Sequence, residues 1–170
     1  MKLEIDTRPP SGAKVAEHFH IGPIMFTVNH HDVPSLFAGE FHALLFRGFV
    51  KGRDYFDLMF FLSKRVPFDA QLLRNATLQT HPETSLDSTD EVLRCLKRRP
   101  REVDQRNIAG DLAPFLLEPH DLRFIASENM IWALDRNIAE GIFAQAPSPP
   151  PPLSLCGRQG ASLLPQGLFL

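Results

Sequence analysis

The stretch FRGFVKGRDYFDLMFFLSKR, residues 46–65, places charged side chains at the start of a strongly apolar segment. A turn at Gly48 and VKG separates two helical patterns, and the second begins near Arg53 and continues to Lys64. Phenylalanine and leucine fill so much of this second pattern that little room is left for solvent, which predicts a central helix. The charged residues at its mouth are Arg47, Lys51, Arg53, Asp54 and Asp57.

This charged cluster fits two kinds of structure. A helix N-terminus offers unpaired N–H groups and partial positive charge, and arginine and lysine are the side chains that recognise phosphate. A site for a phosphate-bearing ligand therefore fits, with Asp54 and Asp57 orienting the cations or holding a water or a metal. The alternative is an ordinary acidic first turn with an Arg53–Asp57 ion pair at i,i+4. Spacing alone leaves both open.

The segment before the cluster predicts another helix, from Val33 to Arg47. Asp32 is a typical N-cap, and Pro34 suits the first turn. The predicted core stripe of this helix is Phe37, Phe41, Leu44 and Leu45. A neighbouring face carries residues three and four apart, which are Glu40, Ala43 and Arg47.

Two strands are predicted near the N-terminus. KLEID, residues 2–6, alternates apolar and polar side chains, and IMFTV, residues 24–28, follows a Gly-Pro pair and is ended by the polar NHHD. A lone pair of strands is marginal in water. We therefore expect a further strand, missing here or in another chain, beside KLEID.

The remainder of the ordered chain predicts helices. A helix capped by Asp69 runs through Gln79, a second spans residues 91–98 and is stopped by Pro100, and two more patterns cover residues 103–118, with an irregular middle, and 121–145. The predicted fold class is α+β, mostly helical. The predicted division is core strands in 1–32, a helical domain in 33–146 and a disordered proline-rich tail in 147–170.

Composition excludes several classes of protein. The 170 residues are 44% apolar, which is typical of a globular protein, and the net charge of −2 gives no general attraction to nucleic acid or anionic membrane. Two cysteines form no disulfide framework and indicate a reducing compartment. The N-terminus is unlike a signal peptide, and no stretch reaches the roughly 18 apolar residues of a membrane span. We expect a soluble, cytoplasmic protein.

Three further groups of residues are candidate sites. Asp6 stands on the predicted strand with Glu4 on the same face, where carboxylates can hold Mg²⁺, or simply face solvent. If their segment is extended, His18 and His20 point the same way, but no supporting ligand stands at zinc spacing, so surface positions are expected. The basic run 97–101 suits a helix C-terminus better than an RNA contact, because aromatic residues are not interleaved with it.

Three segments together resemble a known family. They are KLEIDTRPPSGA, LFAGEFHALLFRGFVKGRDYFDLMFFLSKR and VDQRNIAGDLAPFL, and over residues 2–145 the chain resembles the C-terminal two-thirds of the AbiEii/AbiGii nucleotidyltransferase toxins. The family signature is a helix with a lysine, a small residue and an arginine, then Arg-Asp and a second Asp. The matching positions are Glu40, Ala43, Arg47, Arg53-Asp54 and Asp57.

The resemblance implies a fragment of a polymerase-β-like nucleotidyltransferase sheet followed by a helical bundle. It implies transfer of a nucleotide from an NTP with Mg²⁺, to tRNA or another RNA in some members, and a cognate antitoxin of a bacterial toxin–antitoxin or abortive-infection system. The site residues implied are Asp6, Asp54 and Asp57 as catalytic, Asp6 also as metal ligand, and Lys2, Arg47, Lys51 and Arg53 as nucleotide-binding.

The family's first motif, with its pair of metal-binding carboxylates, would lie before Met1. The expectation is therefore a truncated protein that is inactive as the 170 residues stand. The alternative, from another class, is a non-catalytic helical module that binds a protein partner or RNA.

Overall fold

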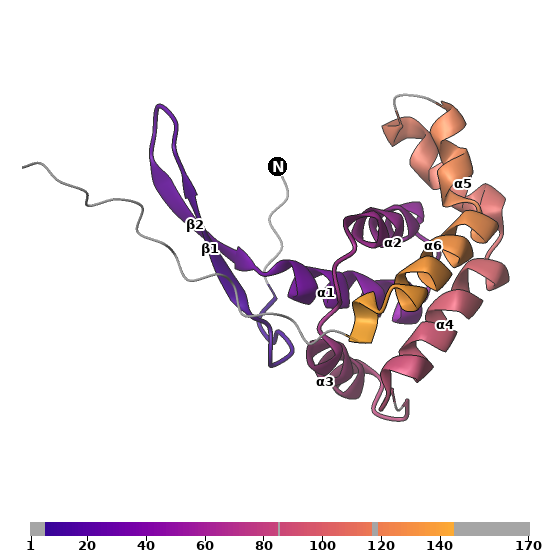
Figure 1. Ribbon diagram of the computed structural model, residues 1–170, viewed down its shortest axis with the longest axis horizontal. Coiled ribbons are helices and arrows are strands. Elements are labelled where there is room, and N and C mark those ends of the chain that lie inside the picture. Colours follow the sequence, from indigo (N-terminus) through magenta and orange to yellow (C-terminus); the bar gives the residue numbers. More distant parts are fainter. Residues whose placement is uncertain (1–5, 85, 117–118, 145–170) are drawn as a thin grey trace, which may run out of the picture.

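The chain folds into a body of packed helices from which a β-hairpin projects (Figure 1). The computed structural model describes residues 6–84, 86–116 and 119–144. The predicted fold class, α+β and mostly helical, is confirmed. The predicted strand KLEID, apart from Asp6, and the predicted proline-rich tail lie outside the described residues. Within the described ranges, no helix is long and apolar enough to span a membrane.

The hairpin consists of β1 (Val15–His20) and β2 (Phe26–His31), paired antiparallel with Val15 opposite His31 and His20 opposite Phe26. The prediction that the polar NHHD ends the second strand is wrong, because backbone pairing continues through His31. Polar residues are compatible with this strand because both of its faces are exposed. His18 and His20 are exposed, as expected.

Helix α1 (Val33–Phe46) follows the hairpin directly. The Asp32 side chain accepts a hydrogen bond from the Ser35 N–H at 2.9 Å, so the predicted N-cap is confirmed. The predicted core stripe is also confirmed for Phe37, Phe41 and Leu44, which are fully or almost fully buried, while Leu45 packs at the margin of the core.

Helix α2 (Gly52–Lys64) is central, as predicted, and packs against α1, α5 and α6 (Figure 1). Its buried face carries Tyr55, Leu58, Phe61 and Leu62. The expectation that the phenylalanines of this helix leave little room for solvent is wrong for Phe56 and Phe60, since 44% and 47% of their surfaces are exposed. These two residues are four apart, so they share one outward stripe of the helix.

Helices α3 (Ala70–Thr80) and α4 (Thr89–Glu102) pack against α1. Asp69 caps α3 as predicted, accepting from the Leu72 N–H at 3.0 Å. The prediction that Pro100 stops α4 is wrong, because the helix continues for two residues beyond it. The proline lies in the last turn and is buried, so packing offsets the missing hydrogen bond.

The last part of the described chain is more divided than predicted. Helix α5 (Gln105–Leu112) passes into a 3-10 helix (Ala113–Phe115), and a second 3-10 helix (Pro119–Ile125) precedes α6 (Ser127–Ala139). The long pattern of 121–145 is therefore interrupted at Ala126, whose backbone is extended. A third 3-10 helix (Ile142–Ala144) ends the described residues.

Candidate functional site

An ion pair between Arg47 and Asp54 holds the turn between α1 and α2, and the Asp54 partner is buried. Arg47 Nε donates to Asp54 Oδ2 at 2.8 Å, and Asp54 is only 4% exposed although it lies in the first turn of α2. The Arg47 guanidinium also lies over the Phe49 ring. The Arg99 side chain donates to the Arg47 carbonyl from α4. Arg47 and Asp54 therefore act as a structural joint as well as members of the charged cluster.

The other three predicted residues of the cluster lie at the start of α2, where Arg53 is exposed and Lys51 and Asp57 are half-buried. Arg53 Nε donates to Asp57 Oδ2 at 3.3 Å, and the Arg53 side chain is 67% exposed. Lys51 occupies the N-cap position and makes no ion pair with any described residue. A helix N-terminus with an ammonium that has no ion-pair partner among the described residues, and with one exposed guanidinium, is suited to an anionic group.

A residue that sequence reasoning missed, Asp111, completes this end of α2. Its Oδ2 accepts a hydrogen bond from the Gly52 N–H at 2.7 Å. The approach depends on glycine, because a Cβ at this position would stand 2.7 Å from the Ile108 carbonyl oxygen and 2.8 Å from Leu112 Cγ. No local signal could have identified Asp111, since the contact joins residues 59 apart in the chain.

These residues surround a hollow of about 470 Å³ between α2 and the end of α5. Its volume lies within the range of small-molecule sites. The lining residues are Lys51, Arg53, Phe56, Asp57, Asp111, Leu112, Phe115 and Leu116. Cations, carboxylates and aromatic rings thus share one surface.

Glu40 of α1 faces the same cluster. Burial raises the pKa of the Glu40 carboxyl above its ordinary value of 4.5, and the carboxylates of Asp57 and Asp54 raise it further, while the guanidinium groups of Arg53 and Arg47 oppose them. The position matched to a lysine in the resemblance therefore holds a half-buried acid beside the charged turn.

Asp6, the proposed metal ligand, lies apart from Asp54 and Asp57. It accepts a hydrogen bond from the Arg8 N–H and lines a different hollow with His31 and His42. Lys2 lies outside the described residues. Among the residues that the structure describes, no three His, Cys, Asp or Glu side chains are placed to hold a metal ion. Asp6, Asp54 and Asp57 therefore do not form one shared metal site among the described residues.

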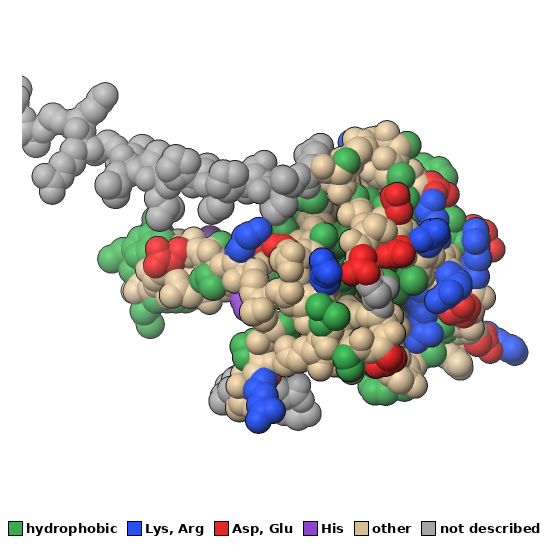
Figure 2. Space-filling view, turned by 90° about the horizontal axis from the view of Figure 1, so that it is seen from below, with side chains coloured by type: hydrophobic (Ala, Val, Ile, Leu, Met, Phe, Trp, Pro, Cys, Tyr) green, Lys and Arg blue, Asp and Glu red, His purple; other side chains and the backbone are tan. Residues whose placement is uncertain are grey.

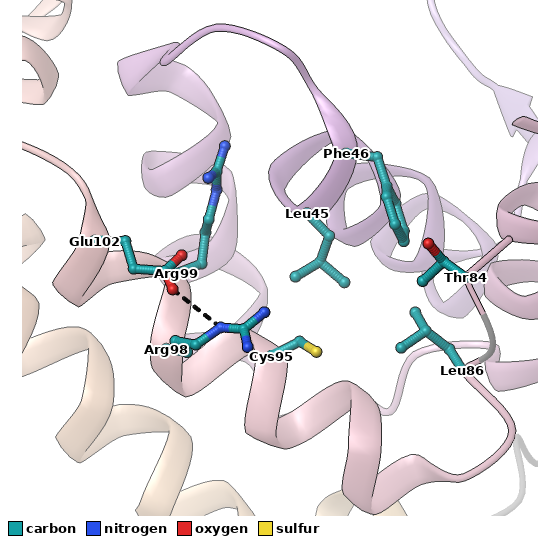
Figure 3. Close-up of a pocket in the computed structure, with 8 residues that line it drawn as sticks. All are labelled: Leu45, Phe46, Thr84, Leu86, Cys95, Arg98, Arg99 and Glu102. Atoms are coloured by element: carbon teal, nitrogen blue, oxygen red, sulfur yellow. Dashed lines mark ion pairs between the residues drawn. The ribbon is translucent and has the colours of Figure 1, made fainter. Parts of the chain in front are cut away.

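A second hollow, of about 240 Å³, lies between α1 and α4 (Figure 3). Figure 3 shows the Arg98–Glu102 ion pair at 3.1 Å on one side of it, with Cys95, Leu45 and Phe46 nearby. Both charged partners come from α4, as expected for a solvated helix end. Its Arg98–Glu102 pair has the same i,i+4 spacing as Arg53–Asp57, with a similar 69% exposure of the arginine.

Comparison with known proteins identifies the family. A family model described as the AbiEii nucleotidyl transferase toxin, of a type IV toxin–antitoxin system, matches residues 1–138. No curated protein and no solved structure matches the chain. The matched range includes α1, α2 and the charged turn between them, and it extends over most of the described residues. The chain belongs to the AbiEii nucleotidyl transferase toxin family.

Proposed function

We propose that the start of α2 binds the phosphate groups of a nucleoside triphosphate. Lys51 and Arg53 supply the positive charge, Asp57 orients Arg53, and the Arg47–Asp54 pair holds the turn in place. The observation that supports this proposal most directly is the hollow in which Lys51 and Arg53 stand together at a helix N-terminus. The family, whose members are nucleotidyl transferases, supports the choice of ligand.

We further propose that residues 1–170 bind nucleotide without transferring it. Transfer to a hydroxyl needs carboxylates that hold Mg²⁺ against the phosphates, and Mg²⁺ is the cofactor that the resemblance implies. Asp54 is engaged by Arg47, Asp57 is engaged by Arg53, and Asp6 lines another hollow. These engagements support a binding role for the described part of the cluster.

Binding is tested with inorganic tripolyphosphate and ATP by thermal unfolding and isothermal calorimetry. A ligand that binds only the folded state raises the melting temperature. Arg53→Ala should weaken tripolyphosphate binding by about tenfold, the scale of one charge-assisted hydrogen bond. Arg98→Ala is the matched control, because it removes an equally exposed arginine from an i,i+4 pair elsewhere. An equal loss of tripolyphosphate affinity in both variants would indicate non-specific attraction by the protein's positive charge, and it would overturn the proposal.

Transfer is tested with labelled NTPs, RNA and Mg²⁺. We expect no labelling of RNA by the 170-residue chain. Mg²⁺-dependent labelling that disappears in Asp57→Ala would contradict this expectation and assign catalysis to the cluster itself.

A second candidate function, a non-catalytic module that binds a protein partner, is supported by the hairpin. Apolar side chains are exposed along it and at its tip, and Figure 2 shows them gathered at the projecting end. They are Val15, Phe19, Ile21, Ile24, Met25, Phe26 and Val28. In a toxin–antitoxin system an antitoxin is such a partner. This candidate predicts that nucleotide leaves the melting temperature unchanged and that Ile24→Ser releases a partner that co-purifies with the unaltered chain.

A further inference from the structure

The hollow at the start of α2 has two chemically different sides. Lys51 and Arg53 stand at the helix N-terminus, whereas Phe56, Leu112, Phe115 and Leu116 bring apolar groups to the same space. A bare phosphate needs only the first side. The apolar side therefore indicates a ligand that carries a flat apolar group next to its anionic group.

Phe115 is presented to this space by the backbone. It ends the short 3-10 helix that follows α5, next to Pro114, and 80% of its surface is exposed. Phe56 lines the hollow from α2 and is 44% exposed. A single exposed aromatic residue is ordinary in a soluble protein. Two that line one hollow from separate elements, beside Lys51 and Arg53, form a platform for a ring.

The spacing along α2 matches the layout of a nucleotide. Arg53 and Phe56 are three residues apart and therefore neighbours on the helix surface, about 5–6 Å between Cβ atoms. A ribose separates the phosphate from the base in a nucleotide, so a phosphate on Arg53 leaves the base within reach of the Phe56 ring. Phe115, from the other element, lines the same region.

We propose that Phe56 and Phe115 form the nucleobase subsite of this hollow, with the base resting on their rings. This inference rests on the proposed function, since it assigns the other end of the same ligand. Aromatic rings stack on any base, because every base has a π-face. Leu112 and Leu116 exclude water from the edge of the platform.

The test compares ATP with inorganic tripolyphosphate on the full 170-residue chain. Phe115→Ala should lower ATP affinity roughly five- to hundredfold, the usual cost of losing one stacking partner, and leave tripolyphosphate affinity unchanged. Phe124→Ala is the matched control, since Phe124 is also exposed (55%), on another 3-10 helix. Phe115→Trp should restore ATP binding and give fluorescence that ATP quenches and tripolyphosphate does not.

Each outcome decides between the two levels of the proposal. If tripolyphosphate binds but ATP binds no more tightly, or if Phe115→Ala and Phe124→Ala have the same effect on ATP, the base subsite is overturned and phosphate binding stands. If the unaltered chain binds neither ligand, the proposed function fails and the base subsite fails with it.

Discussion

The helical body and the β-hairpin are stabilised in opposite ways. The body buries a continuous core, and side chains or long-range contacts cap its helices, with Asp32, Asp69 and the Ser88–Glu91 capping box as examples. In the hairpin, backbone pairing and a ring contact between His20 and Phe26 join β1 to β2, and nearly every residue is exposed on both faces (Figures 1 and 2). The difference shows that the fold of this chain resides in the body, while the hairpin is a surface that the body presents.

The strongest test of this difference is a pair of truncations to alanine. Leu58→Ala removes a fully buried side chain from α2 and should lower the free energy of unfolding by about 2–5 kcal/mol. Val28→Ala removes a side chain that is 40% exposed in β2 and should cost less than about 1 kcal/mol. Urea unfolding measures both. Similar losses would show that the hairpin folds as part of the core.

The next largest effect is expected at Asp69, which joins the base of the hairpin to the body. Its carboxylate accepts from the Leu72 N–H and pairs with Lys14, at 2.9 Å. Burial alone would raise the pKa of Asp69, but these hydrogen bonds outweigh it and hold the pKa below its ordinary value of 3.8. Asp69→Ala should cost about 2 kcal/mol at pH 7.

The pH dependence of this effect has a definite sign. Because the folded-state pKa of Asp69 is depressed, its contribution is complete above pH 3.8 and is lost as the pH falls through the folded pKa. The difference in the free energy of unfolding between Asp69→Ala and the unaltered protein should therefore become smaller in strong acid. A difference in the free energy of unfolding that stays constant into strong acid would contradict a stabilising role for the Asp69 carboxylate.

Glu40→Gln should change the free energy of unfolding less than Asp69→Ala does, and it should raise stability where Asp69→Ala lowers it. The raised folded-state pKa means that the folded protein holds its proton more tightly, so stability falls as the pH rises above 4.5. Glutamine removes this penalty. The variant should be more stable than the unaltered protein at pH 7 and equal to it near pH 4, and it should bind tripolyphosphate more tightly. If the difference in stability between Glu40→Gln and the unaltered protein does not change with pH, the titration of the Glu40 carboxyl is not its cause.

The smallest effect on stability is expected in the hairpin itself. Phe19 is 57% exposed, so Phe19→Ser should change the free energy of unfolding by less than about 0.5 kcal/mol. It should reduce self-association at high concentration, because exposed apolar residues beside a strand edge that no other described strand pairs with favour contact between chains. Analytical ultracentrifugation measures this, with Thr27→Ser as the polar control in the other strand.

Sequence reasoning found the features that depend on neighbouring residues. The bounds of α1 and α2 and the caps Asp32 and Asp69 follow from patterns within one or two turns of the chain. The charged residues of the turn were also identified locally. The sequence pattern did not predict which of these residues would be buried. Asp54 is buried against Arg47, whereas Arg53 remains exposed.

The features that were missed depend on distant contacts or on the lack of burial. No strand was predicted at residues 15–20, because a strand exposed on both faces shows no apolar alternation. Pro100 was expected to end α4, but its carbonyl is fixed by Ser127 and Gln105, which come later in the chain. Asp111 was missed for the same reason, since its partner is the backbone of Gly52.

The contact between Gly52 and Asp111 also constrains how this protein can evolve. Position 52 has no side chain to vary, and its backbone N–H requires an acceptor from α5. A larger residue at 52 becomes tolerable only after the Leu112 side chain shrinks and the Ile108 backbone shifts. We therefore expect four positions to change together in evolution or to remain fixed, although they lie in two separate parts of the gene. They are residues 52, 108, 111 and 112.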